Sequence, residues 1–431
     1  MFKNKNRTRK SRIVAPLVSP GVGGSGVKTR RHKPDYGLLV ITALLMVVGI
    51  VVVYSISPGL AASQGVSQSY FITKQLVDVA VAIVAFAIAA FLPVSFWRKM
   101  TMPLIIAALV GSVAVMVTPI DAVYQAHRWI RLGPLSFQVA ELIKLALIVW
   151  LAGFLSTQSR LGLLRDSKET LRPLILVTIV IAFVVAKLQS DLGSTGVMVA
   201  IIALMAYSAG LPLKRVGLIA ALVAVVAVLA ISTSSYRRDR LATYLNPGRD
   251  CQNTGYQACQ VLISVGSGGV MGLGLGYSVQ AYGYTPEASD DSIFAIMAEQ
   301  FGFMGSVLIL VIYGLFITRL KMIAERTADM FSKMLVIGVM AWLSTQMIIN
   351  VGAMLGLLPL KGITLPLISQ GGTSLVFVTI ALGLVFQISR YTSYSKVNID
   401  EEQKDTTGHD RPLRGRVGRT HRAATVTRPR T

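Results

Sequence analysis

Apolar residues in this chain gather in long continuous runs that are separated by shorter polar segments. Ten such runs lie at residues 37–57, 74–92, 103–119, 139–156, 173–188, 193–210, 215–232, 293–317, 335–355 and 365–389. A helix of about 20 residues crosses a hydrocarbon layer roughly 30 Å thick, whereas the strands of a membrane barrel alternate apolar and polar residues over about ten positions. The pattern therefore predicts an all-α, polytopic membrane protein with ten transmembrane helices.

The runs also divide the chain into a membrane region, residues 36–390, between two polar tails, residues 1–35 and 391–431. The first tail is rich in Lys, Arg, Ser, Gly and Pro, a composition typical of disorder. A large loop, residues 233–292, separates the seventh and eighth predicted spans, and loops of this length are usually functional or disordered. Its part from 261 to 279 is apolar and rich in glycine, which favours a membrane-hugging helix and turn.

Composition supports the membrane interpretation and excludes other classes. Hydrophobic residues make up 53% of the 431 residues and charged residues only 14%, against about 25% charged in soluble proteins, which excludes an ordinary soluble enzyme. The net charge of +22 is concentrated in the tails, since residues 1–33 hold ten Lys or Arg and no acid. Such tails are typical of cytoplasmic segments that contact anionic lipid. No nucleic-acid-binding fold accompanies them, so we expect membrane lipids and no nucleic acid as partners.

Basic loops set the expected orientation of the spans. With the first tail in the cytoplasm, the loops that contain residues 98–99, 160–172, 214–215 and 319–333 are also cytoplasmic, as the positive-inside rule requires, and an even number of spans makes both termini cytoplasmic. The cations left on the outer side are Arg128, Arg131, Arg237, Arg238, Arg240, Arg249 and Lys361. A single outer cation is ordinary, but this set indicates a site for an anionic ligand presented from outside.

The outer loop contains both cysteines and a glycine-rich sequence. Cys251 and Cys259 lie on the oxidising side, where they form either a disulfide or two free thiols, and spacing alone does not decide between them. Three of the four histidines lie in the tails, so no Cys/His cluster indicates zinc. Residues 272–276 alternate Gly and Leu, but no βαβ unit surrounds them, which excludes a dinucleotide site.

Ionisable residues in or beside apolar runs are functional candidates, because burial of a charge in a membrane is costly. They are Asp78, Glu141, Lys144, Lys187, Asp191, Asp291 and Glu299. Glu141 and Lys144 lie three residues apart on one helical face, so they either neutralise each other or place Lys144 in a polar cavity where Glu141 orients it. Asp291 directly precedes a span, where a carboxylate either caps the helix or serves chemistry.

Several short motifs follow one another along the chain. They are His127-Arg128-Trp129-Ile130-Arg131-Leu132-Gly133, Phe137-Gln138-Val139-Ala140-Glu141-Leu142-Ile143-Lys144, Gln189-Ser190-Asp191-Leu192-Gly193, Tyr236-Arg237 with Arg240, Pro286 to Phe294, and Leu365 to Ser374. In this order they resemble the signatures of the SEDS family (FtsW, RodA and SpoVE), over about residues 35–390. The segment from Gly274 to Gln280 is most similar to the cell-division branch. Val139, Ala140 and Ser289 are among the positions that depart from the family pattern.

The resemblance implies a glycosyltransferase that polymerises lipid II into peptidoglycan during cell division. The 4-hydroxyl of an acceptor sugar would attack the anomeric carbon of a donor and displace undecaprenyl diphosphate. The family's catalytic aspartate falls on Asp291, because the spacing to Ile293-Phe294 distinguishes it from Asp290. One base suffices for an inverting displacement, and an ionised Asp could accept the hydroxyl proton. Burial and the adjacent Asp290 would raise the pKa of Asp291.

The resemblance also implies substrate-binding residues and partners. We expect substrate contacts from Arg128, Glu141, Lys144, Gln189, Asp191, Arg237, Arg240, Gln280, Glu287, Lys361 and Ser369. The cations in this set would stabilise the leaving diphosphate, together with a divalent cation, Mg²⁺ or Mn²⁺, that Asp291 would share, although the sequence shows no dedicated metal cage. Expected partners are lipid II, a class B penicillin-binding protein and other division proteins at the septum of the bacterial cytoplasmic membrane.

Two other functions are compatible with a ten-span bundle. One is a flippase for lipid-linked precursors, and the other is a non-catalytic division scaffold that works through its tails. A flippase requires a polar path across the bilayer, whereas most of the candidate groups here cluster toward the outer ends of the spans. A scaffold would not require Asp291. We therefore expect an enzyme.

Overall fold

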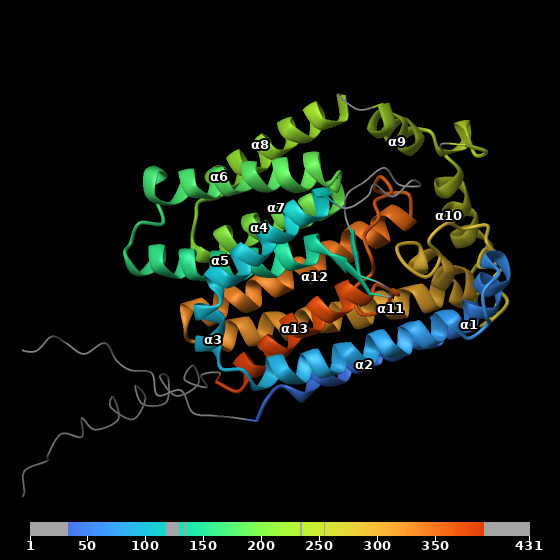
Figure 1. Cartoon of the computed structure of the whole chain (residues 1–431), viewed down its shortest axis with the longest axis horizontal. Helices are drawn as coiled ribbons and strands as arrows, with labels where there is room; N and C mark the ends of the chain where they lie inside the picture. The colour runs from blue at the N-terminus through green and yellow to red at the C-terminus, as the bar shows by residue number, and fades with distance from the viewer. Residues whose placement is uncertain (1–32, 118–128, 133–134, 233–234, 254, 392–431) are drawn as a thin grey trace, which may run out of the picture. The chain divides into compact units, whose positions relative to one another are not determined.

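The structure, a computed structural model, describes residues 33–117, 129–132, 135–232, 235–253 and 255–391 (Figure 1). The helices are α1 (Tyr36–Gln64), α2 (Tyr70–Phe91), α3 (Val94–Lys99), α4 (Thr101–Val117), α5 (Val139–Arg160), α6 (Arg172–Ile181), α7 (Leu192–Ala209), α8 (Leu213–Ser232), α9 (Ser235–Leu245), α10 (Tyr256–Ser267), α11 (Ile293–Arg326), α12 (Met330–Met354) and α13 (Gly372–Ser389). The π-helical segments η1 (Ser167–Leu171) and η2 (Ala182–Leu188) flank α6, so that one continuous helix covers 167–188. A 3-10 turn, η3 (Pro247–Arg249), follows α9.

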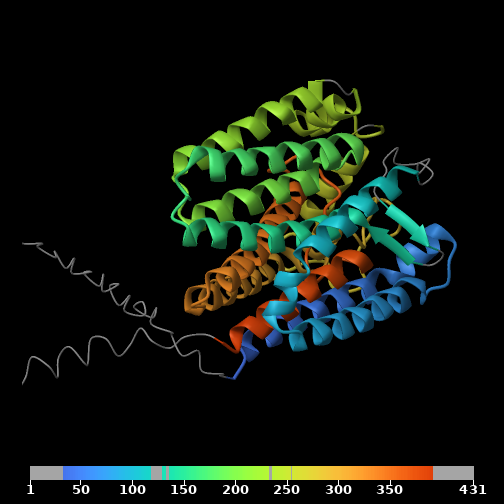
Figure 2. The same cartoon turned by 60° about the vertical axis from the view of Figure 1, so that its left-hand side comes forward.

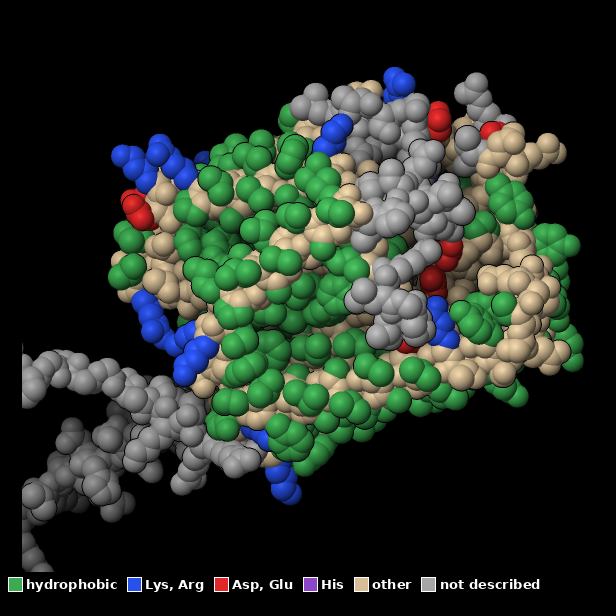
Figure 3. Space-filling view, in the orientation of Figure 1, with side chains coloured by type: hydrophobic (Ala, Val, Ile, Leu, Met, Phe, Trp, Pro, Cys, Tyr) green, Lys and Arg blue, Asp and Glu red, His purple; other side chains and the backbone are tan. Residues whose placement is uncertain are grey.

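Each of the ten predicted spans coincides with one of these helices. In the part of the chain that the structure describes, eight helices are long and apolar enough to cross a membrane. The other two predicted spans correspond to α4, which is apolar but has only 17 residues, and to α8, which has 20. Figure 3 shows an apolar surface along the helices, with most visible charged side chains toward its two ends. The chain is a multi-pass helical membrane protein, as the pattern predicted.

Some boundaries of the spans differ from the prediction. The first helix continues beyond residue 57 to Gln64, where Gly65 ends it in the left-handed conformation (φ 66°). The eighth predicted span continues beyond residue 317 to Arg326, because polar residues of its last turns still extend the helix outside the apolar run. The last predicted span begins at Gly372 rather than at 365, since residues 365–371 form a non-helical segment that contacts the candidate site.

The pattern did not predict a small hairpin of two antiparallel strands, β1 (Trp129–Leu132) and β2 (Leu135–Gln138). Trp129 pairs with Gln138, and α5 begins directly after β2. The Thr373 hydroxyl donates to the Ser136 carbonyl at 2.5 Å, which attaches the hairpin to the start of α13. Strands of four residues are too short to give a recognisable alternation, so the sequence offered no signal for them.

The centre of the bundle is α12, which packs against α5, α7 and α11. Figure 2 shows α5 to α8 on one side of α11 and α12, with α1, α2 and α13 on the other. Gly338 permits the close packing, since a Cβ there would lie 2.6 Å from Ile148 of α5 and 2.8 Å from Met205 of α7. Small residues are the usual means by which membrane helices approach closely. The packing fixes α12, which supplies several polar side chains to the candidate site.

The helix α11 is broken at Gly302 (φ 66°, ψ −165°), and a glycine-rich segment, residues 268–274, fills the break. The Leu273 amide donates to the Glu299 carbonyl at 2.9 Å. Gly272 has no substitute there, because a Cβ would lie 2.2 Å from the Gln300 carbonyl oxygen. Residues 293–300 are buried, whereas Phe303 directly after the break is exposed. The break therefore separates a half-helix embedded in protein from a half that has one buried and one exposed apolar face.

The first and last described helices meet at one end of the bundle, because the Asp35 amide donates to the Ser389 hydroxyl at 3.0 Å. We call this the tail end. The helices α9 and α10 lie at the opposite end, the loop end, together with the start of α11 (Figure 1). Acidic side chains are visible in a recess at the loop end (Figure 3).

Candidate active site

Asp291 lies at the loop end, in the turn that enters α11. The N-cap residue of this helix is Ser292, which makes no side-chain cap bond, and the Asp291 carboxylate accepts from the Ser292 hydroxyl at 3.4 Å. Helix capping, one of the two roles that the sequence left open, is therefore not the role of Asp291. Its side chain is 9% exposed.

The backbone around Asp291 is held from two sides. On α12, the Asn350 amide donates to the Asp291 carbonyl and to the Ile363 carbonyl, both at 2.7 Å. The Ser369 hydroxyl donates to the Asp290 carbonyl at 2.6 Å and accepts from the Leu365 amide at 2.7 Å. The bonds to Asp290 and Asp291 go to their backbone carbonyls. They therefore fix the main chain of both residues without using their carboxylates.

Burial raises the pKa of Asp291 well above its usual range, and repulsion from Glu287 and then Asp290 adds to the effect, while Arg240 opposes it. Asp290 keeps part of its surface exposed, yet it lies deep enough for burial to raise its pKa to about 7. Repulsion from Glu287 again contributes, and Lys74 opposes the shift. Neighbouring carboxylates of this kind titrate as a pair and are better proton acceptors than ordinary acids.

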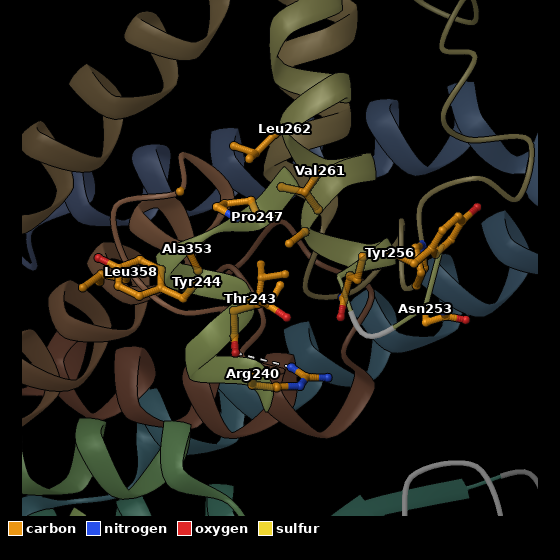
Figure 4. A pocket seen from close by; sticks show the side chains of 15 residues that line it. Arg240, Thr243, Tyr244, Pro247, Asn253, Tyr256, Val261, Leu262, Ala353 and Leu358 are labelled. Atoms are coloured by element: carbon orange, nitrogen blue, oxygen red, sulfur yellow. Dashed lines mark hydrogen bonds between the residues drawn. The ribbon is translucent and has the colours of Figure 1, made fainter. Parts of the chain in front are cut away.

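A cavity of about 280 Å³ lies at the loop end (Figure 4). Its polar lining residues are Arg240, Thr243, Tyr244, Asn253, Tyr256 and Gln257, and Val261, Leu262, Ala353, Leu358 and Leu360 are among the apolar ones. Pro286, which also lines it, lies five positions before Asp291 in the chain. The Arg240 guanidinium donates to the Leu360 carbonyl at 3.4 Å, and its charge still reaches Asp291. The cavity thus combines a cation, several polar groups and an apolar wall, and Arg240 links it electrostatically to Asp291.

Glu141 and Lys144 face each other inside the protein. The Lys144 ammonium donates to the Glu141 carboxylate at 2.6 Å and to the Gln346 side chain at 3.0 Å, and Lys144 is only 1% exposed. Of the two alternatives from the sequence, the structure has the mutually neutralised pair. Gln346 covers the ammonium, and a substrate contact from either residue stays a prediction. Gln346 in turn donates to the Thr364 carbonyl at 3.0 Å, which connects the pair to the segment that Asn350 joins to Asp291.

Gln189 and Asp191 are both buried directly before α7. Asp191 is the N-cap residue of α7, and its carboxylate accepts from the Ser194 amide at 2.9 Å. The Gln189 side chain is 1% exposed and its amide atoms have no hydrogen-bond partner among the described residues. Lys361 lies against the same helix, since a Cβ on Gly193 would be 3.3 Å from the Lys361 Cβ. The structure thus places Lys361 against the first turn of α7, the helix that Asp191 caps.

Gln280 and Glu287 lie in the segment that leads to Asp291. The Gln280 side chain is buried and accepts from the Thr285 hydroxyl at 3.1 Å. Glu287 has a left-handed backbone (φ 51°), and its carbonyl accepts from the amides of Asp290 and Ser292 at 3.0 and 3.1 Å. Its exposed carboxylate acts on both aspartates through its charge.

Two of the cations expected to bind substrate have side chains outside the part of the chain that the structure describes. Arg128 lies outside the described residues, and Arg237 lies in α9 with its side chain outside the described part. Of the two alternatives for the cysteines, a disulfide or two free thiols, the structure has the disulfide between Cys251 and Cys259.

The family is shown by comparison with known proteins. The sequence profile of the FtsW/RodA/SpoVE family, described as cell cycle proteins, matches residues 36–394. The chain belongs to this family. Its relatives include a probable peptidoglycan glycosyltransferase FtsW from Saccharophagus degradans, 36% identical over 88% of this chain and 97% of that protein. Stage V sporulation protein E from Bacillus subtilis is 32% identical over 85% of this chain and 100% of that protein.

Solved structures of SEDS proteins have the same fold. A chain from a peptidoglycan synthase complex that coordinates polymerization and crosslinking superposes with a TM-score of 0.68, at 27% identity, and the match covers 83% of this chain and 98% of that chain. RodA from Thermus thermophilus superposes with a TM-score of 0.60, at 25% identity, over 83% of this chain and 97% of that chain.

Sequence reasoning missed several polar residues of this SEDS site. Asn350 and Gln346 are four residues apart on one face of α12, and a search for amides in apolar runs, rather than for ionisable groups alone, would have found them. Lys74 was placed at the edge of a span, yet its charge acts on Asp290. Glu299 was a candidate without a role, and its buried carboxylate accepts from the Ser278 hydroxyl at 2.5 Å and the Val279 amide at 3.0 Å.

A metal site is not apparent in the described part of the chain. No three His, Cys, Asp or Glu side chains there are arranged to hold an ion. Asp290, Asp291 and Glu287 are close enough to influence one another electrostatically but do not converge as ligands. The described residues therefore form no preassembled metal cage, and the divalent cation stays a prediction.

Proposed function

We propose that this chain is a peptidoglycan glycosyltransferase that polymerises lipid II, with Asp291 as general base and undecaprenyl diphosphate as leaving group. The observation that carries the proposal is a buried carboxylate with a raised pKa, held by its backbone and influenced by an arginine that lines a cavity. The names of the FtsW relatives supply the reaction class.

The geometry suits one inverting displacement. Asp291 would take the proton from the 4-hydroxyl of the acceptor sugar while that oxygen attacks the anomeric carbon of the donor. The bond from this carbon to the diphosphate breaks, and its electron pair leaves with undecaprenyl diphosphate. A base whose pKa lies closer to neutrality shares the proton more effectively in the transition state than an ordinary Asp. No covalent sugar intermediate is required.

Charge that develops on the leaving diphosphate requires cations at the same place. Arg240 is the described residue best placed for this, because it lines the cavity and its charge reaches Asp291. Arg128, Arg237 and Lys361 remain predicted contributors from the sequence. A divalent cation, Mg²⁺ or Mn²⁺, would add Lewis-acid stabilisation if it arrived bound to the diphosphate, with Asp291 as its protein ligand.

The proposed setting is the septum of a bacterial cytoplasmic membrane, with a class B penicillin-binding protein and other division proteins as partners. A similar chain is part of a synthase complex that coordinates polymerization and crosslinking, which supports a crosslinking partner here. The contact between Asp35 and Ser389 supports placing both tails on one side of the membrane. That side would be the cytoplasm, with the loop end outside.

The test is polymerisation of labelled lipid II by the purified full chain, alone and with a cognate class B penicillin-binding protein, with glycan length measured on a gel. Asp291→Asn should lose activity by about 10²–10⁴-fold, because a neutral amide cannot accept the proton. Asp290→Asn is the matched control and should be much milder. An Asp291→Asn protein within about tenfold of wild type would contradict the role of Asp291. Transfer of lipid II across vesicles without any polymer would support a flippase instead.

A further inference from the structure

The helix α9 carries Arg240 but is weakly attached to the membrane bundle. None of its side chains that the structure describes is buried. Its contacts to the far wall of the cavity include the 3.4 Å bond from Arg240 to the Leu360 carbonyl, and a bond from the Tyr244 hydroxyl to the Leu357 carbonyl at 2.9 Å. Two exposed or partly exposed hydrogen bonds contribute little to holding a helix in place. The chain segment that connects α9 to α10 is therefore a further determinant of where Arg240 lies.

This connecting segment is a tight turn that the disulfide closes. The sulfurs of Cys251 and Cys259 lie 3.7 and 3.1 Å from the Pro247 carbonyl oxygen. Asp250 organises the same turn, since its carbonyl accepts from the Gly255 amide at 2.9 Å and its carboxylate accepts from the Asn253 amide at 3.2 Å. The chain that leaves α9 is thus folded back onto the disulfide.

The other end of the disulfide is firmly anchored. Cys259 is buried in the first turns of α10. The Ser264 hydroxyl, on the same helix, donates to the Ala295 carbonyl of α11 at 3.0 Å, and Val261 is buried. The disulfide is therefore a covalent connection from the turn after α9 to a helix packed on the half of α11 that follows Asp291.

We propose that the Cys251–Cys259 disulfide is a positioning cross-link that fixes α9, and with it Arg240, in the wall of the cavity at the loop end. Tyr256 and Gln257, which line the cavity, lie between the two cysteines in the closed loop and are held by the same bond. The effect on polymerisation rests on the proposed function, whereas the effect on α9 does not.

Cleavage of the cross-link is simple thiol chemistry. Cys251 is exposed, so a thiolate of a dithiol reductant reaches its sulfur. The S–S bond breaks, the two sulfurs gain two electrons and two protons in total, and the reductant closes to its own cyclic disulfide. The turn is then left with its hydrogen bonds, and α9 gains freedom to move away from Leu360.

The experiment compares the oxidised full chain, the same protein after reduction with dithiothreitol, and the double variant Cys251→Ala/Cys259→Ala, all in lipid nanodiscs. Hydrogen exchange of the amides of residues 238–245 should become about tenfold faster on reduction, the scale of one lost hydrogen bond, while exchange in α5 stays unchanged. Polymerisation of lipid II should fall about tenfold. The double variant should match the reduced protein and ignore reductant, and reoxidation should restore only the wild type.

The outcomes separate the two proposals. Unchanged exchange in 238–245 after reduction verified by mass spectrometry overturns the positioning role, and so does faster exchange with unaltered polymerisation. If the oxidised wild type polymerises no lipid II while α9 still loosens on reduction, the proposed function fails and the positioning role is supported.

Discussion

Asp290 and Asp291 are neighbours in the chain, but their surroundings give them different properties. Asp291 is nearly buried and responds to Arg240, whereas Asp290 is more exposed and responds to Lys74. The sequence identified Asp291 through family spacing, and its raised pKa follows from burial that no sequence pattern measures. Local repulsion from Asp290 was foreseen, but the larger contribution of Glu287 depends on the turn that brings its carboxylate back toward both aspartates.

The pH profile of polymerisation should shift in opposite directions in two variants. Glu287→Gln removes a repulsion that raises the pKa of Asp291, so the base is deprotonated at lower pH and the acid limb moves down. Arg240→Ala removes an attraction that lowers this pKa, so the acid limb moves up. Initial rates between about pH 5 and 9, a range that brackets a base tuned toward neutrality, check both shifts, with Arg238→Ala, an exposed neighbour on α9, as control. Shifts of the same sign would rule out this electrostatic account.

At the scale of elements, α12 carries a line of amides from the interior to the site. Gln346 contacts Lys144, and Asn350, four residues later, contacts the backbone of Asp291. The sequence predicted the helix well, because its apolar run is long. The sequence did not predict the role of the Gln346 and Asn350 amides, since the periodicity of a helix does not show which other segment packs against its buried face. The pairing of Glu141 with Lys144 was one of two local alternatives that only the tertiary contact with Gln346 distinguishes.

Lys144→Met should destabilise the protein by about 3–5 kcal/mol, because it leaves the Glu141 carboxylate buried without its partner. The double variant Glu141→Gln/Lys144→Met removes both charges and should regain most of the stability. Thermal unfolding in detergent measures both. The refolded double variant should also keep most of its polymerase activity, since Lys144 is buried. A stable but inactive double variant would instead support the substrate contact that the sequence predicted.

The glycine segment that fills the break in α11 offers a matched pair of substitutions. Gly272 and Gly276 both have a positive φ, 80° and 82°, but a Cβ at 272 would meet the Gln300 carbonyl at 2.2 Å, whereas nothing lies within 4 Å at 276. Gly276→Ala should cost about 1–2 kcal/mol for the left-handed backbone alone. Gly272→Ala adds a backbone clash, so its yield of folded protein should be far lower in size-exclusion chromatography. Equal yields would contradict the tight insertion.

At the scale of the whole molecule, the length of the apolar runs was the feature from which the sequence predicted the helical architecture. All ten runs became helices because a membrane demands satisfied backbone groups along each crossing. Hydrophobic length does not predict the structure at the loop end, because backbone groups there can form hydrogen bonds with water as well as with protein. The hairpin and α9 therefore had no clear signature. The helix and turn predicted over 261–279 overlap α10 only in part, since α10 begins at Tyr256 and ends at Ser267.

The break at Gly302 also bears on how the enzyme senses its bilayer. The half of α11 after the break exposes one apolar face, so we expect it to tilt when the hydrocarbon thickness changes, while the half before the break is enclosed by protein. We predict that the break at Gly302 absorbs this tilt before it reaches Asp291. Polymerisation in bilayers of increasing acyl length should therefore vary little, until thickness strains the other spans. A steep dependence within a few ångströms of the optimum would mean that the break is rigid.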